Sequence, residues 1–132
     1  MEYKFTIPGK PGTKQRPRMG QGYTYTPKET IYYENLVKVS YQDQIHTFLD
    51  GPIAAEIKCF YEPPKSASNK KRQQMLSGEI KYTKKNDLDN SAKTILDALN
   101  NVAYHDDAQI YDMHVTKAYA EVPRVEVKLQ TI

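Results

Sequence analysis

The sequence contains one cysteine, Cys59, among its 132 residues. A lone thiol excludes the framework of internal disulfides that is typical of small secreted proteins. Long apolar runs are also missing, since no stretch approaches the roughly 20 apolar residues that a membrane-spanning helix needs. The first residues, MEYKFTIPGK, lack the basic-then-apolar pattern of a secretion signal and alternate like a strand. These absences predict an intracellular, cytoplasmic protein without a membrane partner.

Internal repeats are absent as well, and 132 residues is a length that one ordinary core can fill. We therefore predict a single domain over residues 1–132. The formal net charge is only +3, which is a weak indication of an acidic partner. The distribution of the charges along the chain is more informative than their total.

Hydrophobic periodicity predicts the element order β-α-β-α-α-β-β. Strands are expected at 2–7, 53–61, 109–119 and from about 125, and helices at about 27–49, just before Gly78 and from about Leu88. The stretch 8–25 is rich in Gly and Pro and is expected to be a loop. Because helices and strands do not alternate strictly, we predict an α+β fold in which helices pack on a small mixed β-sheet of about four strands.

Three of these elements have an expected buried face. In the 53–61 strand the face consists of Ile53, Ala55, Ile57, Cys59 and Tyr61. In the 27–49 helix, which Thr26 and Pro27 would begin, it consists of Tyr32, Leu36, Val39, Ile45, Phe48 and Leu49. In the last helix it consists of Leu88, Ala92, Ile95, Leu96 and Leu99.

Aspartates gather in one short part of the chain. They are Asp87, Asp89, Asp97, Asp106 and Asp107, and Lys84 and Lys85 stand just before the first of them. Each acid alone has an ordinary explanation. Acids stabilise helix N-termini, they form i, i+4 pairs with a lysine such as Lys93, and they occur in turns. Taken one at a time, these explanations are the favoured ones.

Taken together, the acids favour a metal site. Asp87 and Asp89 precede a helix, and Asp106 and Asp107 precede a strand, so the helix and its return loop can bring both pairs to one edge of a sheet. Converging carboxylates repel one another unless they are protonated or share a cation. A hard divalent ion suits oxygen ligands, and we expect Mg²⁺, with Mn²⁺ as a substitute. The spacing is not that of an EF-hand loop, which argues against that class of calcium site.

Basic residues surround the acids. Those expected to contact DNA phosphates are Lys14, Arg16, Arg18, Lys70, Lys71, Arg72, Lys84 and Lys85. Such contacts give affinity without base information, and solvated basic loops are the competing explanation. Acids, a metal ion and a basic surround together suit phosphodiester cleavage. Lys93, one turn after Asp89, is expected to touch the scissile phosphate or to orient a carboxylate.

Two stretches carry a family resemblance, DLDNSAKTILDALNN (87–101) and HDDAQI (105–110). They are reinforced by KQRPRM (14–19), YTPK (25–28), PPKSASNKKR (63–72) and YTKKNDLDN (82–90), and in order and spacing the match covers most of the chain. The sequence resembles the RusA family of Holliday-junction resolvases, small endodeoxyribonucleases common in phages and prophages. The resemblance implies Mg²⁺-dependent cleavage of four-way DNA junctions by a homodimer, in recombination and repair, without a nucleotide cofactor.

The resemblance also assigns roles to residues. Asp87, Asp89 and Asp107 match the family's essential metal-binding aspartates, and Lys93 matches its catalytic lysine. Asp106, a further expected metal ligand, and Gln109 complete the D-D-x-Q motif. Asn86 stands where many relatives have Pro, and Ser91 where a larger apolar residue is usual. Neither difference removes a charged group from the expected site.

A homodimer also follows from the expected reaction. Resolving a junction needs two nicks related by a two-fold axis, and two identical sites in a symmetric dimer provide them. Two alternatives stay open. One is a nuclease that acts on flaps or replication forks, and the other is a protein that binds branched DNA without cutting it. Incubation of each branched substrate with Mg²⁺ or Mn²⁺ separates these alternatives.

Overall fold

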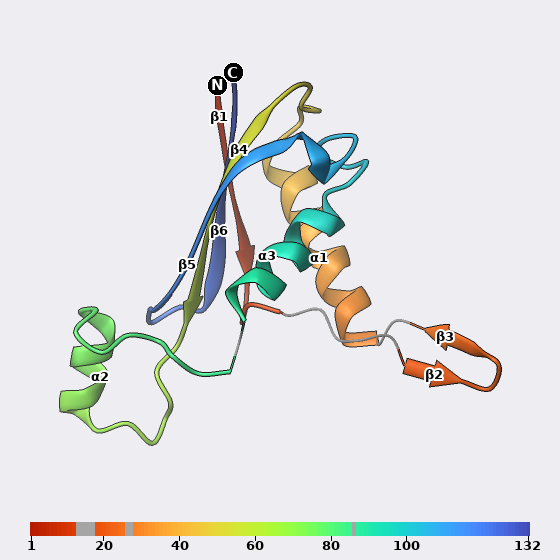
Figure 1. Cartoon of the computed structure of the whole chain (residues 1–132). Helices are drawn as coiled ribbons and strands as arrows, with labels where there is room; N and C mark the ends of the chain where they lie inside the picture. The colour runs from red at the N-terminus through yellow and green to blue at the C-terminus, as the bar shows by residue number, and fades with distance from the viewer. Residues whose placement is uncertain (13–17, 26–27, 86) are drawn as a thin grey trace.

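The computed structural model describes residues 1–12, 18–25, 28–85 and 87–132. A four-stranded mixed sheet carries two long helices on one face (Figure 1). The sheet strands are β1 (Glu2–Pro8), β4 (Ile53–Tyr61), β5 (Ile110–Tyr119) and β6 (Arg124–Thr131). The remaining elements are the hairpin strands β2 (Arg18–Gly20) and β3 (Tyr23–Tyr25), the helices α1 (Lys28–Gln44), α2 (Asn69–Leu76) and α3 (Leu88–Ala98), and the 3-10 helix η1 (Asp107–Gln109). The predicted α+β fold with a small mixed sheet is confirmed.

The strand order is β1-β6-β4-β5, and β6 runs antiparallel to both of its neighbours while β4 and β5 are parallel. The strands β1, β4 and β5 therefore point the same way and end at one edge of the sheet, here called the C-terminal edge. The opposite edge is called the N-terminal edge. A parallel pair needs a crossover connection, and α3 provides it by returning the chain from the end of β4 to the start of β5.

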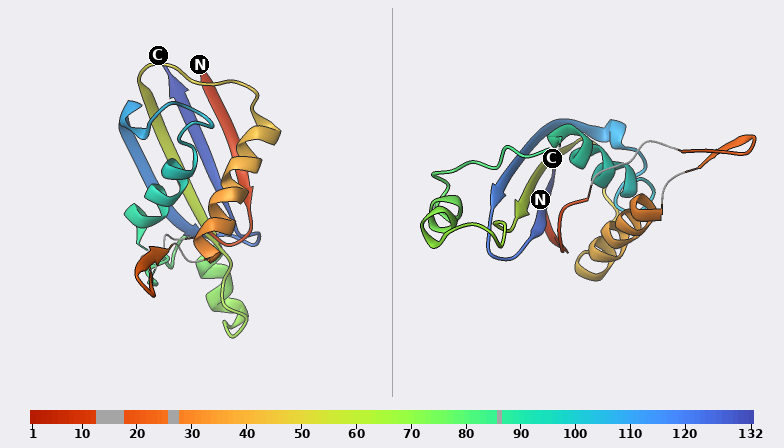
Figure 2. Two further views of the ribbon diagram at one scale, coloured as in Figure 1. Left: turned by 90° about the vertical axis from the view of Figure 1, so that its right-hand side faces the viewer. Right: turned by 90° about the horizontal axis from the view of Figure 1, so that it is seen from below.

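The core lies between the sheet and the pair α1 and α3 (Figure 2). All five residues of the predicted inner face of β4 are buried, including Cys59 at 1% exposure. In α3, the predicted stripe is buried except for Leu88, which is half-buried. Among the described residues, no helix is long and apolar enough to cross a membrane.

The first long helix differs from its prediction in length and in orientation. It ends at Gln44 instead of Leu49, and Tyr32 and Val39 are 71% and 51% exposed. The buried positions are instead Thr30, Val37, Ser40 and Tyr41. Two of these are small polar residues, so hydrophobic periodicity selected the wrong face of the helix.

The 8–25 stretch is not all loop. It contains the β2–β3 hairpin, whose turn includes Gly22 at a positive φ of 80°. Glycine adopts this conformation without steric cost, so Gly22 supports the turn. The expected capping residues Thr26 and Pro27 lie outside the described residues.

Candidate functional site

Asp87 begins α3 but does not cap it. The residue occupies the N-cap position with extended backbone angles, φ −65° and ψ 127°, and its side chain makes no capping hydrogen bond. An aspartate at this position usually accepts from a backbone N–H of the first turn. The exposed carboxylate of Asp87 is therefore left for another partner at the C-terminal edge.

One exposed stripe of α3 carries charged side chains along the length of the helix. Asp89, Lys93 and Asp97 follow one another at spacings of four residues, so they share one face. Asp89 and Lys93 are exposed, and Asp97 is half-buried. The opposite face packs on the sheet through residues such as Ile95, which is fully buried. The stripe therefore faces away from the core, and it runs along α3 from the C-terminal edge of the sheet towards the N-terminal edge.

Three carboxyl groups meet where α3 ends. Asp107 lies in η1 and its side chain is in hydrogen-bonding contact with Asp106 and Asp97. Burial, followed by these contacts and by the charges of both neighbours, raises the pKa of Asp107 from 3.8 to about 6. A raised pKa in an acid that lies among other acids indicates repulsion between the carboxylates, and a bound cation would reduce this repulsion.

Backbone contacts hold this cluster in place. The side-chain oxygen of Asn100, just after α3, accepts from the backbone N–H of Asp107 at 2.8 Å. Asp106 caps η1 by accepting from the N–H of Ala108, and the Gln109 oxygen accepts from the N–H of Asp106 at 3.2 Å. The Gln109 amide also donates to the carbonyls of Leu49 and Gly51, at 3.2 and 3.0 Å. Asp106 and Gln109 thus shape the turn that presents Asp107.

The acids at the two ends of α3 do not meet within one chain. Asp87 and Asp97 are ten residues apart in a helical run, which corresponds to roughly 15 Å. Helix α3 begins at the C-terminal edge and ends at the N-terminal edge (Figure 1), so Asp87 and Asp89 at its start lie far from Asp97 near its end, which contacts Asp107. Within the described part of the chain, no group of three His, Cys, Asp or Glu side chains is arranged so that it could hold a metal ion, and this includes the cluster of Asp97, Asp106 and Asp107. The oxygen donors suit Mg²⁺ in kind, but one chain brings too few of them together.

Two arms leave the C-terminal edge. The β2–β3 hairpin follows β1, and α2 follows β4, so the two arms extend on either side of the start of α3 (Figure 2). Helix α2 carries Lys70, Lys71 and Arg72 and buries none of its residues. Lys84 and Lys85 are exposed just before Asp87. Lys84 and Lys85 thus directly precede Asp87 in the chain, whereas the cations of α2 lie on an arm that projects from the sheet, and the predicted contacts of all five with DNA stay a prediction.

Part of the predicted basic set cannot be located. Lys14 and Arg16 fall outside the described residues. Arg18 begins β2, and the structure describes its backbone but not its side chain.

Sequence reasoning missed two residues of the acidic cluster. Neither Asp97 nor Asn100 is among the site residues that the sequence predicts. Their contacts with Asp107 depend on the direction in which the chain turns back after α3. The available signal was the spacing of four residues from Lys93 to Asp97, which continues the charged stripe to the end of the helix.

Comparison with known proteins gives two findings. Residues 8–130 match the family described as "Endodeoxyribonuclease RusA". The chain is also similar to "Uncharacterized protein YqaN" of Bacillus subtilis (strain 168), with 37% identity over 136 residues that cover 98% of this chain and 96% of the relative. The matched region contains the acids of both edges and the basic arms. The chain therefore belongs to the RusA family of endodeoxyribonucleases.

Proposed function

We propose that this nuclease is a Mg²⁺-dependent enzyme that resolves four-way DNA junctions by paired, symmetric nicks in recombination and repair. The observation that carries the proposal is the division of the acids between the two ends of α3, with basic arms beside one end. The family supplies the reaction class, hydrolysis of DNA phosphodiester bonds. The charge distribution supports a DNA backbone as the ligand, since basic side chains flank acids that a polyanion would otherwise avoid.

The candidate site contains residues for two roles, binding the metal ion and binding the scissile phosphate. Asp87, Asp89 and Asp107, with Asp106 or Asp97 beside the last, would hold the metal ion. When bound, Mg²⁺ supplies a water of lowered pKa and neutralises charge on the reacting phosphate. Lys93 lies one helical turn from Asp89 and holds the scissile phosphate against the acids.

The basic arms position the DNA. The cations of α2 and the pair Lys84 and Lys85 bind phosphates on either side of the cut. These contacts fix the path of the strand but do not select bases.

A second copy of the chain completes the site. The strand β5 is an edge strand that pairs only with β4, and it runs opposite to α3. If two β5 edges pair antiparallel about a two-fold axis, the start of one β5 lies beside the end of the other. Asp107 just precedes β5, and Asp87 lies near its end, where Lys117 donates to the carbonyl of Lys84 at 3.3 Å. The pairing brings Asp107 to the partner's Asp87 and Asp89 and forms two identical sites.

The test of the function is a junction-cleavage assay with products mapped on all four strands. We expect symmetric nicks in Mg²⁺ and none in EDTA. Asp89→Asn should lower the cleavage rate by at least about a hundredfold, since it removes a metal ligand, while DNA binding persists or tightens. The control is Asp43→Asn, which removes the same charge at an exposed position of α1 and should cut normally.

Three other results would contradict the proposal. Preferential cutting of flaps or forks would move the activity to other branched DNA. Binding without any product over a range of Mg²⁺ and Mn²⁺ would make the chain a branched-DNA-binding protein. Cleavage by Asp89→Asn at the normal rate would remove Asp89 from the metal site.

A further inference from the structure

A pocket lined by tyrosines opens at the C-terminal edge, and of its lining residues only Lys84 has a role described above. It has a volume of about 250 Å³. Its lining residues are Lys10, Tyr61, Glu62, Pro63, Pro64, Lys65, Tyr82, Lys84, Tyr119 and Pro123. They come from the ends of β4 and β5, the segments after β1 and before β6, and the segment that leads to α3. The pocket is thus built where the chain leaves β4 towards α2 and where it returns towards the start of α3.

Aromatic rings form the floor of the pocket. Tyr61 and Tyr119 are cross-strand partners at the ends of the parallel strands β4 and β5. The Tyr82 ring stacks on that of Tyr61, with centroids 4.0 Å apart and planes 9° from parallel, and meets Tyr119 edge-on at 5.2 Å. All three tyrosines are buried. Because the rings are packed against one another, only the parts of them that line the pocket are open to a nucleobase, and these parts need no further ordering to contact it.

Prolines and lysines complete the pocket. Pro63, Pro64 and Pro123 add apolar wall without backbone N–H donors. The charged lining is three lysines, Lys10, Lys65 and Lys84, against the single acid Glu62. All three lysines are exposed, so their ammonium groups are free to reach phosphates at the mouth. An apolar floor with a cationic rim matches a nucleotide, whose base is flat and apolar on its faces and whose phosphates are anionic.

A fixed contact links the pocket to the predicted site. The Lys117 ammonium lies 5.3 Å from the centroid of the Tyr82 ring and donates to the carbonyl of Lys84. This lysine therefore holds the 82–85 segment against the sheet. Lys84 stands three residues before Asp87, a reach of roughly 10 Å at most. A nucleotide at the pocket would be a near neighbour of the phosphate at Asp87.

We propose that this pocket takes one unpaired or flipped nucleotide of the DNA, with its base on the tyrosine–proline floor and its phosphates on the lysine rim. The proposal rests on the proposed function, since the nucleotide belongs to the branched DNA that is cut. A stacked duplex cannot insert a base into a concave site, whereas a branch point has bases that unstack at low cost. The base held there would influence which phosphodiester bond lies at the acids, so the pocket is a determinant of cleavage position.

The test measures binding in EDTA by fluorescence anisotropy, so it does not depend on cleavage. Abasic sites are placed one at a time through the strand near the branch point. One position should weaken binding by the wild-type protein about tenfold, because a stacked base is lost. The abasic scan changes the DNA and leaves the protein fold intact.

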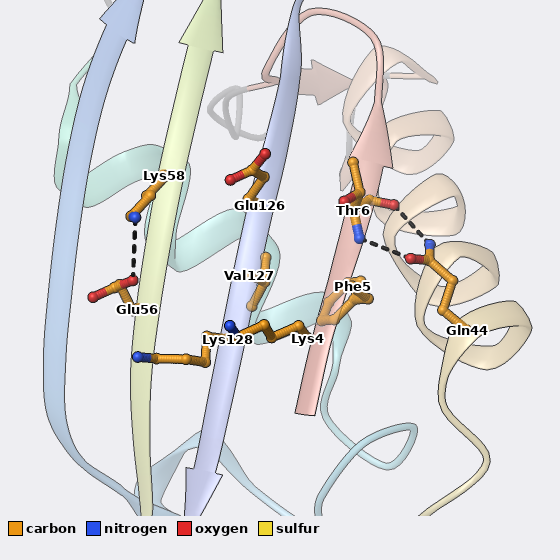
Figure 3. A pocket seen from close by; sticks show the side chains of 9 residues that line it. All are labelled: Lys4, Phe5, Thr6, Gln44, Glu56, Lys58, Glu126, Val127 and Lys128. Carbon is orange, nitrogen blue, oxygen red and sulfur yellow. Dashed lines mark hydrogen bonds and ion pairs between the residues drawn. The ribbon is translucent and has the colours of Figure 1, made fainter. Parts of the chain in front are cut away.

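A matched pair of variants tests the rim. The rim variant carries Lys10→Ala, Lys65→Ala and Lys84→Ala, and the control carries Lys4→Ala, Lys58→Ala and Lys128→Ala. The control lysines lie on the face of the sheet that bears no helix (Figure 3). Both variants remove three charges. We expect the rim variant to bind at least about tenfold more weakly with a shallower salt dependence, and the control to change binding by less than about threefold.

The two perturbations should also couple. The abasic site that weakens binding by the wild-type protein should weaken binding by the rim variant much less, because the base and its phosphates bind as one unit. Equal loss in both variants, or a flat abasic scan, would overturn the proposal. If no abasic position weakens binding but the protein nicks junctions normally, the proposal for the pocket fails and the nuclease function stands. If one abasic position weakens binding but the protein does not nick junctions, the nuclease function fails and the proposal for the pocket stands.

Discussion

At the scale of single residues, Asp107 shows how the fold prepares a carboxyl group for a cation. Its backbone N–H is held by Asn100, and its side chain meets Asp97 and Asp106. Burial, followed by these contacts, raises its pKa to about 6, so that at neutral pH the ionised form is present against the repulsion of its neighbours. A metal ion would convert this repulsion into shared coordination.

The raised pKa predicts a pH-dependent stability in EDTA. Since the folded-state pKa of about 6 lies above the ordinary value of 3.8, the contribution of protonated Asp107 is complete below pH 3.8 and is lost as the pH rises through 6. Asp107→Asn imitates the neutral acid. It should therefore raise the melting temperature at pH 8 and change it little at pH 4, as followed by calorimetry. An equal change at both pH values, or the same gain from Asp43→Asn, would contradict the raised pKa.

The sequence showed the types of residue at the candidate site better than their arrangement. The spacing of Asp87, Asp89 and Lys93 is local, so helical geometry was enough to relate them. The expected convergence of Asp87 and Asp89 with Asp107 depended on the path of the chain. Within one chain these acids lie at opposite ends of α3 and stay apart. Asn100 contacts Asp107 across a turn, which no local pattern predicts.

At the scale of elements, the two outer strands of the sheet, β1 and β5, differ in what covers their free sides. On β1, the Gln44 side chain accepts from the N–H of Thr6 at 2.9 Å and donates to its carbonyl at 2.8 Å, as a neighbouring strand would. On β5, the outer edge has no neighbouring strand in the sheet order, and Tyr111 and Met113 are 63% and 46% exposed. A long edge strand with exposed apolar side chains is a template for pairing with another chain.

Charging the β5 edge should therefore separate the dimer. Tyr111→Lys with Met113→Lys should convert the dimer to a monomer in light scattering coupled to size exclusion, and should abolish junction nicking. The double variant should still fold, because both side chains are exposed in the single chain. The control is Ile31→Lys with Val39→Lys, which adds the same charges at exposed apolar positions of α1. A dimer that persists in the β5 variant would place the interface elsewhere.

The elements also differed in how well they could be predicted. The alternation in β4 and the stripe in α3 were clear because both elements bury a purely apolar face. Helix α1 buries Thr30 and Ser40 beside Val37, so its apolar residues did not mark its inner face. The strand order could not be predicted, because β1 pairs with β6 across nearly the whole chain.

At the scale of the whole molecule, the proposed dimer makes each site from two chains. A mixture of two inactive variants tests this sharing. Asp89→Asn and Asp107→Asn should each be inactive alone. After random reassortment, half of the dimers are mixed and each mixed dimer keeps one intact site, so about a quarter of the wild-type nicking should return.

The control mixture pairs Asp87→Asn with Asp89→Asn, two lesions at the same end of α3. Every site in that mixture carries a lesion, so no nicking should return. Failure of the Asp89→Asn and Asp107→Asn mixture to recover activity, with dimers present, would mean that each site belongs to one chain.

The position of β6 has a consequence for how the protein is made. This strand lies between β1 and β4, and it follows both of them in the chain. On a ribosome, β1 and β4 emerge before β6, the strand that lies between them in the sheet. They therefore cannot be joined into one sheet until β6 has left the exit tunnel. The complete sheet that supports α3 therefore cannot form before β6 has emerged, so a nascent chain that still lacks β6 should not nick DNA.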